Sequence, residues 1–138
     1  MYFQSATFHI QDVSSKLKAT ASIMKILITI LGILNGGYML VDGIYVLLNG
    51  KYIGPEKPGP WSNLFEKMGM DVFKLSPLFI IIGLIWLLWV YALWTNQNWT
   101  YGVGITISIL TLWYVPFGTL ISLVTLGILF FGKEKLGL

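Results

Sequence analysis

Residues 23–48, IMKILITILGILNGGYMLVDGIYVLL, decide the fold class of this chain. The stretch is almost wholly apolar and long enough for one tilted helix to cross the ~30 Å hydrocarbon core of a membrane. Five polar residues recur along it at a 3-4-3-4 spacing, which places them within an arc of roughly 80° on a helix. These residues, called here the polar stripe, are Asn35, Tyr38, Asp42, Tyr45 and Asn49. The sequence therefore predicts a membrane-spanning helix with one polar face.

The composition of the whole chain favours the same class. Of the 138 residues, 56% are hydrophobic and 11% are charged, and the mean hydropathy is +0.76. Soluble domains average about 25% charged residues, so this balance predicts a membrane protein. All nine basic residues are lysine. The absence of arginine argues against nucleic acid as a partner, because guanidinium groups are favoured for that recognition.

The remaining apolar segments complete an all-α, polytopic membrane protein with four transmembrane helices in a bundle. The expected spans are about 23–48, 77–95, 99–115 and 117–132. The last two are short and are separated by a Pro-Gly reversal, so a re-entrant hairpin is the alternative. Apolar residues at helical spacing also predict an interfacial amphipathic helix in the first loop; they are Trp61, Leu64, Phe65, Met68 and Val72.

The ends of the chain are polar. Residues 1–5 resemble the remnant of a cleavable expression tag, residues 6–22 form a polar leader, residues 23–132 form the membrane domain and residues 133–138 form a polar tail. Four spans place both termini on one side. Five lysines flank the termini and four lie in the first loop, so the positive-inside rule predicts a multi-pass protein of the cell membrane with cytoplasmic termini.

Asp42 is the strongest functional lead in the sequence. An ionisable side chain within a span is costly and is usually kept for a partner, a pathway or a ligand. Asp42 lies about 9 Å beyond the middle of its span, and the lysines lie at or beyond the ends of the apolar segments. The carboxyl group must therefore be protonated, hydrogen-bonded, or facing water or a cation. Two interpretations stay open: a polar path or site, and a structural network with Ser or Thr of the last two spans.

Small residues in the apolar segments predict close helix packing. Small side chains recur at spacings that let helices approach closely, either in oligomer contacts or inside one bundle. The residues concerned are Gly32, Gly36, Gly43, Gly104, Ser108, Gly118 and Ser122.

Trp86 lies near the middle of the second apolar segment. Anchoring at the membrane interface does not explain that position, so Trp86 either fills the core or lines a cleft for an apolar ligand.

Signatures of enzymatic chemistry are missing from the sequence. It has no cysteine and one histidine, and no catalytic or metal-ligand motif is recognisable, so we expect no catalytic residues, no metal site and no required cofactor.

The segment 113–121, WYVPFGTLI, is similar to the last helical hairpin of small, uncharacterised four-span prokaryotic membrane proteins. In these proteins an aromatic-rich third span turns into the fourth at a Pro-x-Gly-Thr element. The resemblance implies a four-helix membrane bundle and no particular activity.

Three functions are compatible with the sequence. The first is a non-enzymatic assembly or interaction module in the lipid bilayer, acting in a homo-oligomer or a larger complex. The second is a small oligomeric channel or transporter that uses the polar stripe. The third is a quinone- or lipid-binding protein that uses Trp86. We expect the first.

Overall fold

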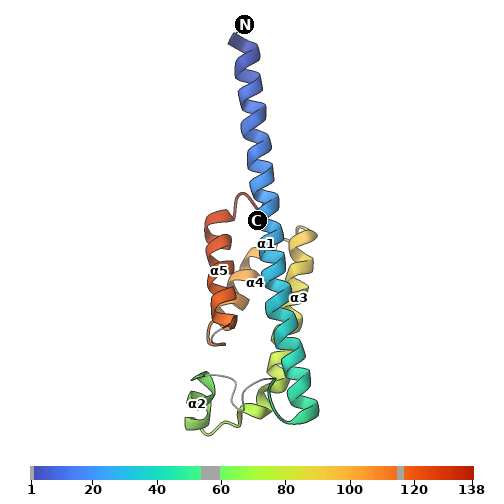
Figure 1. Ribbon diagram of the computed structural model, residues 1–138, viewed down its shortest axis with the longest axis vertical. Coiled ribbons are helices and arrows are strands. Elements are labelled where there is room, and N and C mark those ends of the chain that lie inside the picture. The colour runs from blue at the N-terminus through green and yellow to red at the C-terminus, as the bar shows by residue number, and fades with distance from the viewer. Residues whose placement is uncertain (1, 54–59, 115–116) are drawn as a thin grey trace.

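The computed structural model describes residues 2–53, 60–114 and 117–138, and these residues form helices and turns without a strand. The elements in chain order are α1 (Tyr2–Asn49), α2 (Pro60–Lys67), the short 3₁₀ helix η1 (Val72–Leu75), α3 (Ser76–Trp94), α4 (Thr100–Leu110) and α5 (Phe117–Gly132). Helix α3 runs antiparallel to α1, and α4 and α5 form a hairpin beside this pair (Figure 1). Both α1 and the segment Val72–Trp94 are long and apolar enough to cross a membrane.

Helix α1 is longer than the apolar segment of its sequence. It begins in the polar leader and continues to Asn49 as one helix of 48 residues, about 72 Å at 1.5 Å per residue. No glycine or proline interrupts the chain between residue 2 and Gly32, so no helix-breaking residue separates the leader from the apolar segment. The part of α1 before residue 23 projects beyond the other helices (Figure 1).

Helices α1 and α3 approach so closely that their backbones touch at glycines. A Cβ atom placed on Gly83 would lie 2.7 Å from the carbonyl oxygen of Gly36. A Cβ on Gly36 would lie 2.7 Å from the Cβ of Trp86, and one on Gly43 would lie 2.9 Å from the carbonyl oxygen of Ser76. This contact explains the pairing, because small residues let helix axes come together. It also aligns Asn35 and Trp86 at one depth of the bundle.

The first loop contains a shorter helix than the sequence predicted. The expected amphipathic helix extends from Trp61 to Val72, but α2 ends at Lys67. Gly69 has a φ of 78°, and the N–H groups of Gly69 and Met70 donate to the carbonyls of Glu66 and Phe65. This pair of bonds is a Schellman C-cap, which ends a helix at a left-handed glycine. The chain then forms η1, which leads directly into α3.

Helix α4 is also shorter than the predicted segment 99–115. It ends at Leu110, and residues 111–113 form turns. The Oγ1 atom of Thr111 donates to the carbonyl of Ile107 at 2.8 Å and lies 2.6 Å from the Oγ atom of Ser122 on α5. A threonine that bonds to the preceding helical turn competes with the helix, and here it also ties α4 to α5. The hairpin therefore turns before α4 reaches the full expected length.

Candidate functional site

The five residues of the polar stripe lie in different environments. Asn35 and Asp42 are each 1% exposed, whereas Tyr38 is 41% exposed. Tyr45 is half-buried, and Asn49 is exposed and donates from Nδ2 to the carbonyl of Tyr45 at 3.2 Å. The buried face of α1 consists of Ile28, Gly32, Asn35, Gly36, Met39, Asp42, Gly43 and Val46. The polar stripe is thus divided, with two members inside the bundle and the others at its edge or outside.

Both carboxylate oxygens of Asp42 accept hydrogen bonds from other parts of the chain. The backbone N–H of Ile53, which follows α1, donates to Oδ1 at 3.1 Å. The hydroxyl of Tyr114, which lies between α4 and α5, donates to Oδ2 at 2.8 Å. We call these three residues the Asp42 latch. A buried carboxylate needs such partners, and here they join α1 to the first loop and to the tip of the hairpin.

Aromatic rings surround the latch at the lower end of the bundle. The rings of Trp61 and Trp113 meet edge to face with centroids 4.9 Å apart, and those of Phe79 and Tyr114 lie 5.3 Å apart. This aromatic layer consists of Tyr38, Tyr52, Trp61, Phe65, Phe73, Phe79, Trp113, Tyr114 and Phe117. It brings four separate parts of the chain together around the tip of the α4–α5 hairpin.

Tyr52 fixes the first loop within this layer. Its hydroxyl donates to the carbonyl of Val72 at 2.5 Å, and the residue is buried. Burial raises the pKa of Tyr52 well above its ordinary value, and the nearby carboxylates of Asp42 and Asp71 add to the rise. Each cause disfavours the phenolate, so the neutral hydroxyl is held as a donor.

The small residues of the sequence pattern lie against neighbouring parts of the same chain. Gly32, Gly36 and Gly43 pack on α3. Gly104 lies close to Trp89 and Leu129, and Gly118 lies close to Tyr114. Ser108 and Ser122 are buried, and Ser108 donates to the carbonyl of Gly104 at 2.7 Å. These contacts are inside the bundle.

Trp86 lies in the interior, between α1 and α3. Its side chain is fully buried and meets Trp89 edge to face, with ring centroids 5.5 Å apart. The Nε1 atom of Trp89 donates to the carbonyl of Thr100 at 2.8 Å, whereas Nε1 of Trp86 has no hydrogen-bond partner in the described part of the chain. Trp86 is therefore packed in the interior of the bundle.

Two of the grooves on the apolar surface of the bundle are lined by residues that the structure describes. The α1–α5 groove has a volume of about 230 Å³ and is lined by Leu34, Asn35, Tyr38, Phe117 and Ile121. The second groove, between α3 and α4, has a volume of about 190 Å³ and is lined by Ile82, Ile85, Gly102, Val103, Thr106, Ile107 and Leu110. Asn35 is the one strongly polar, buried residue among these linings, and its Nδ2 atom has no partner among the described residues.

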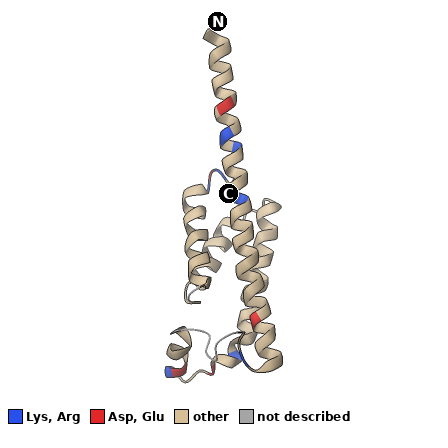
Figure 2. Ribbon diagram, viewed as in Figure 1, with Lys and Arg blue, Asp and Glu red and all other residues tan. Residues whose placement is uncertain are grey.

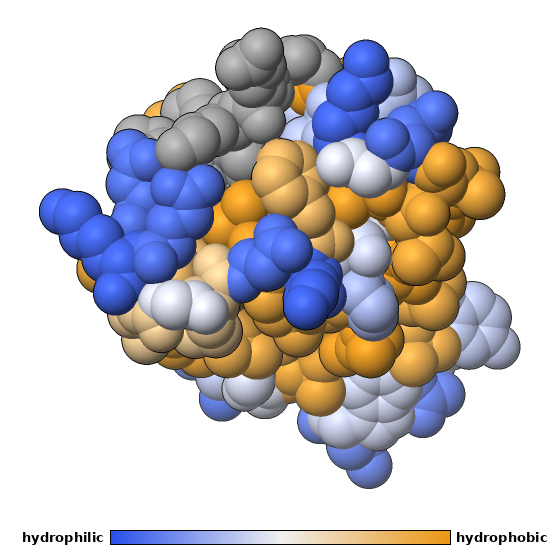
Figure 3. Space-filling model, turned by 90° about the horizontal axis from the view of Figure 1, so that it is seen from below, coloured by the Kyte–Doolittle hydropathy of each residue, from blue (hydrophilic) through white to orange (hydrophobic). Residues whose placement is uncertain are grey.

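Among the described residues, the charged ones lie mainly on the projecting part of α1 and near the two ends of the bundle (Figure 2). Asp42 is the one charged residue of α1 after Lys25. At the upper end, the Nζ atom of Lys25 lies 4.7 Å from the ring centroid of Trp94, and that of Lys133 lies 4.4 Å from the ring of Tyr101. Trp94 also donates from Nε1 to Thr29 at 2.9 Å. Viewed from the lower end, hydrophilic side chains form separate patches among hydrophobic ones (Figure 3).

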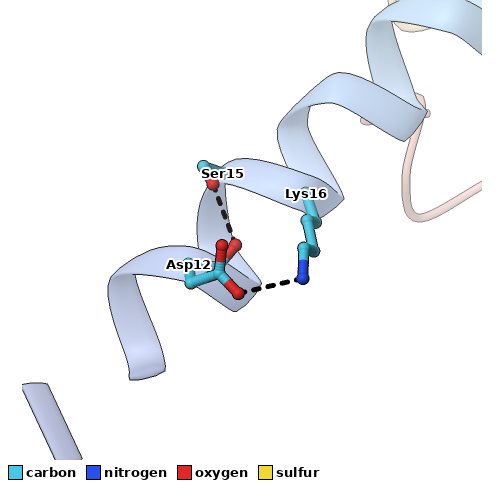
Figure 4. A network of polar contacts seen from close by, with 3 residues as sticks. All are labelled: Asp12, Ser15 and Lys16. Atoms are coloured by element: carbon cyan, nitrogen blue, oxygen red, sulfur yellow. Dashed lines mark hydrogen bonds and ion pairs between the residues drawn. The ribbon is translucent and has the colours of Figure 1, made fainter. Parts of the chain in front are cut away.

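The projecting part of α1 carries a local polar network. Lys16 Nζ lies 2.9 Å from Asp12 Oδ2, and Ser15 Oγ donates to the carbonyl of Asp12 at 2.8 Å (Figure 4). These bonds join neighbouring turns of one helix. The lone histidine, His9, is exposed on the same segment, and no group of three or more metal-binding side chains exists in the described residues.

Sequence reasoning did not identify the partners of Asp42. Ser or Thr of the last two spans was one expected set of partners, whereas the donors are a tyrosine and a loop amide. The sequence feature that could have identified the hydroxyl donor is Tyr114, which lies just before the Pro-Gly reversal. Comparisons of the chain with known protein families, with curated proteins and with solved structures found no match.

Proposed function

We propose that this protein is a small, non-enzymatic integral membrane protein that acts as an assembly module. The bundle is the membrane anchor, and the projecting segment of α1 is the surface that assembles. The observation that carries the proposal is that α1 continues as one exposed helix beyond the bundle. Helices in proteins gain most of their stability by packing an apolar face against a neighbour, so a partner for the apolar side chains of the projecting segment is expected.

The surface of the bundle supports the membrane assignment. Between Lys25 and Lys51, α1 has Asp42 as its one charged residue, over roughly 36 Å at 1.5 Å per residue. Large apolar side chains are exposed around the bundle, and they include Ile30, Val41, Leu47, Ile81, Leu88, Ile109, Leu123, Phe130 and Phe131. Monomeric soluble proteins rarely expose contiguous apolar surface on this scale.

The hairpin geometry favours two full crossings, α1 and α3, with α4–α5 as a re-entrant hairpin. The 11 residues of α4 extend only about 17 Å. Its tip is bonded to Asp42, which lies about 9 Å past the middle of the first span. Irregular backbone at that depth must be sheltered by protein, and the aromatic layer provides this shelter.

Either topology places both termini on the same side, and the lysine count favours the cytoplasm of the cell for that side. Single-cysteine labelling tests the topology directly, because the chain has no cysteine. We expect a membrane-impermeant maleimide to label Asn96→Cys from the side of the termini and Asn63→Cys from the opposite side. Phe117→Cys at the hairpin tip should resist labelling from both sides. Labelling of Phe117→Cys from the Asn63 side would show that the hairpin crosses.

The assembling surface is a stripe on the projecting helix, in residues 6–22, which we call the N-terminal arm. Ala6, Ile10, Val13 and Leu17 recur at a 4-3-4 spacing, within roughly 60° of one another around the helix, and the three larger ones are exposed. Such a spacing is the seam of a two-stranded coiled coil. Asp12 and Lys16 pair with each other outside this stripe. We therefore propose a second copy of the chain as the partner.

Native mass spectrometry of the protein released from lipid nanodiscs tests the assembly. The wild type should appear as a dimer, and Leu17→Lys, which places a charge in the seam, should appear as a monomer. Gln11→Lys is the matched control, because residue 11 lies on the opposite side of the arm, and it should remain dimeric. A variant lacking residues 2–5 should also remain dimeric. A monomeric wild type, or a dimer that persists in Leu17→Lys, would contradict the proposal.

A further inference from the structure

The α1–α5 groove is lined by one residue whose buried amide donor has no acceptor among the described residues. Asn35 lines this groove and is 1% exposed, and its Nδ2 atom has no hydrogen-bond partner among the described residues. Buried polar groups in folded proteins are paired in the great majority of cases. The Nδ2 atom itself has less than 1 Å² of accessible surface, so an acceptor that arrives from outside the chain reaches it through rotation of the Asn35 side chain toward the groove.

The depth of Asn35 restricts the acceptor. Residue 35 is at the middle of the apolar stretch 23–48, and hence near the middle of a hydrocarbon core about 30 Å thick. The carbonyls of phospholipids lie at the interfacial regions, about 15 Å away. Water is scarce at the middle of the core. An acceptor at this depth that is not part of a protein is therefore a carbonyl of a neutral, lipid-soluble molecule.

The shape and walls of the groove restrict the molecule further. The volume is about 230 Å³, and Tyr38 and Phe117 contribute aromatic side chains whose ring centroids lie 6.2 Å apart. A dry cavity of about 150 Å³ is known to hold benzene, so this groove has room for a substituted six-membered ring. Leu34 and Phe117 are both exposed at its edge, which leaves a path for an apolar tail into the surrounding lipid.

We propose that the α1–α5 groove binds the ring of a lipid-soluble quinone, with Asn35 Nδ2 donating a hydrogen bond to one ring carbonyl. The exposed tail of the quinone lies among the lipids beside α1 and α5. This is a binding site and involves no electron transfer by the chain. It goes beyond the assembly role, since the groove and the N-terminal arm are separate parts of the molecule.

Equilibrium binding of radiolabelled decylubiquinone to the full chain in nanodiscs tests the site, with empty nanodiscs as the background. Loss of one hydrogen bond predicts a Kd roughly three- to tenfold higher for Asn35→Leu. The matched control Asn49→Leu makes the same substitution at the exposed end of α1 and should bind like the wild type. Ile121→Phe retains the amide but fills the groove, and should weaken binding more than tenfold.

Several results would overturn the proposal. These are an absence of saturable binding above the background, equal Kd values for Asn35→Leu and Asn49→Leu, and complete displacement of the quinone by an equimolar fatty acid such as oleate. Thermal unfolding without quinone separates a folding defect from a binding defect. Asn35→Leu removes an unpaired amide and should unfold no earlier than the wild type. If Asn35→Leu fails to fold, an unchanged Kd in Ile121→Phe is the refuting result.

Discussion

Removing the hydroxyl of Tyr114 should destabilise the whole bundle, because that hydroxyl is one of the two donors in the Asp42 latch. Tyr114→Phe keeps the aromatic ring and its contacts with Phe79 and Trp61, whose centroids lie 5.3 and 6.0 Å away. It deletes the hydroxyl that donates to Asp42 Oδ2 at 2.8 Å and that also bonds to the side chain of Tyr38. Since Asp42 is 1% exposed, water cannot readily replace the lost donor.

The size of the effect follows from the charge and burial of the acceptor. Hydrogen bonds to charged groups contribute about 1.5–3 kcal/mol, and a buried acceptor left unpaired carries a desolvation cost of similar size. We therefore expect the free energy of unfolding to fall by about 2 kcal/mol. For a chain of this length, that loss corresponds to a decrease in Tm of roughly 5–10 °C.

Thermal unfolding in nanodiscs, followed by far-ultraviolet circular dichroism, measures this change. Tyr91→Phe is the matched control, because Tyr91 is 64% exposed on the outer face of α3, and its Tm should stay within about 2 °C of the wild type. A double-mutant cycle with Asp42→Asn should give a coupling energy of about 1–2 kcal/mol. A Tyr114→Phe protein with an unchanged Tm, or a coupling energy near zero, would refute the latch.

Two further predictions concern the close helix contact and the first loop. Gly83→Ala places a Cβ 2.7 Å from the carbonyl oxygen of Gly36 and should cost about 1–3 kcal/mol in thermal unfolding. Gly37→Ala, which meets nothing within 4 Å, should instead be neutral or stabilising, and equal effects of the two would contradict the contact. Burial raises the pKa of Tyr52, so the stabilisation by its neutral hydroxyl is present below its unfolded pKa of about 10 and is lost as pH rises through the higher folded pKa. Tyr52→Phe should flatten this alkaline loss of stability in a pH series of Tm values, and a slope identical to the wild type would count against it.

The class of the fold could be predicted from periodicity and hydropathy, whereas the partners of Asp42 could not. Apolar runs predicted the helices that became α1, α3 and α5, and the structure contains two helices long enough to cross a membrane. The donor Tyr114 is separated from Asp42 by 72 residues. Their meeting depends on how far the hairpin extends before it turns, and no local propensity encodes that depth.

The ends of the helices also depend partly on local sequence and partly on contacts between distant residues. The continuation of α1 through the leader was accessible to sequence reasoning, because no glycine or proline interrupts that segment. The early end of α4 was less accessible, since it coincides with a side-chain contact between Thr111 and Ser122. Asn35 was identified from its spacing, but its unpaired amide and the adjoining groove depend on how α5 lies beside α1.

Helix α1 runs without interruption from the N-terminal arm to Asp42. Residues 2–49 contain no proline. Of the two adjacent glycines in α1, Gly36 packs against Trp86 and Gly83, whereas Gly37 meets nothing within 4 Å. One continuous helix therefore connects the N-terminal arm with Asp42. The proposed pairing of two arms and the bond from Tyr114 to Asp42 thus act on one and the same helix.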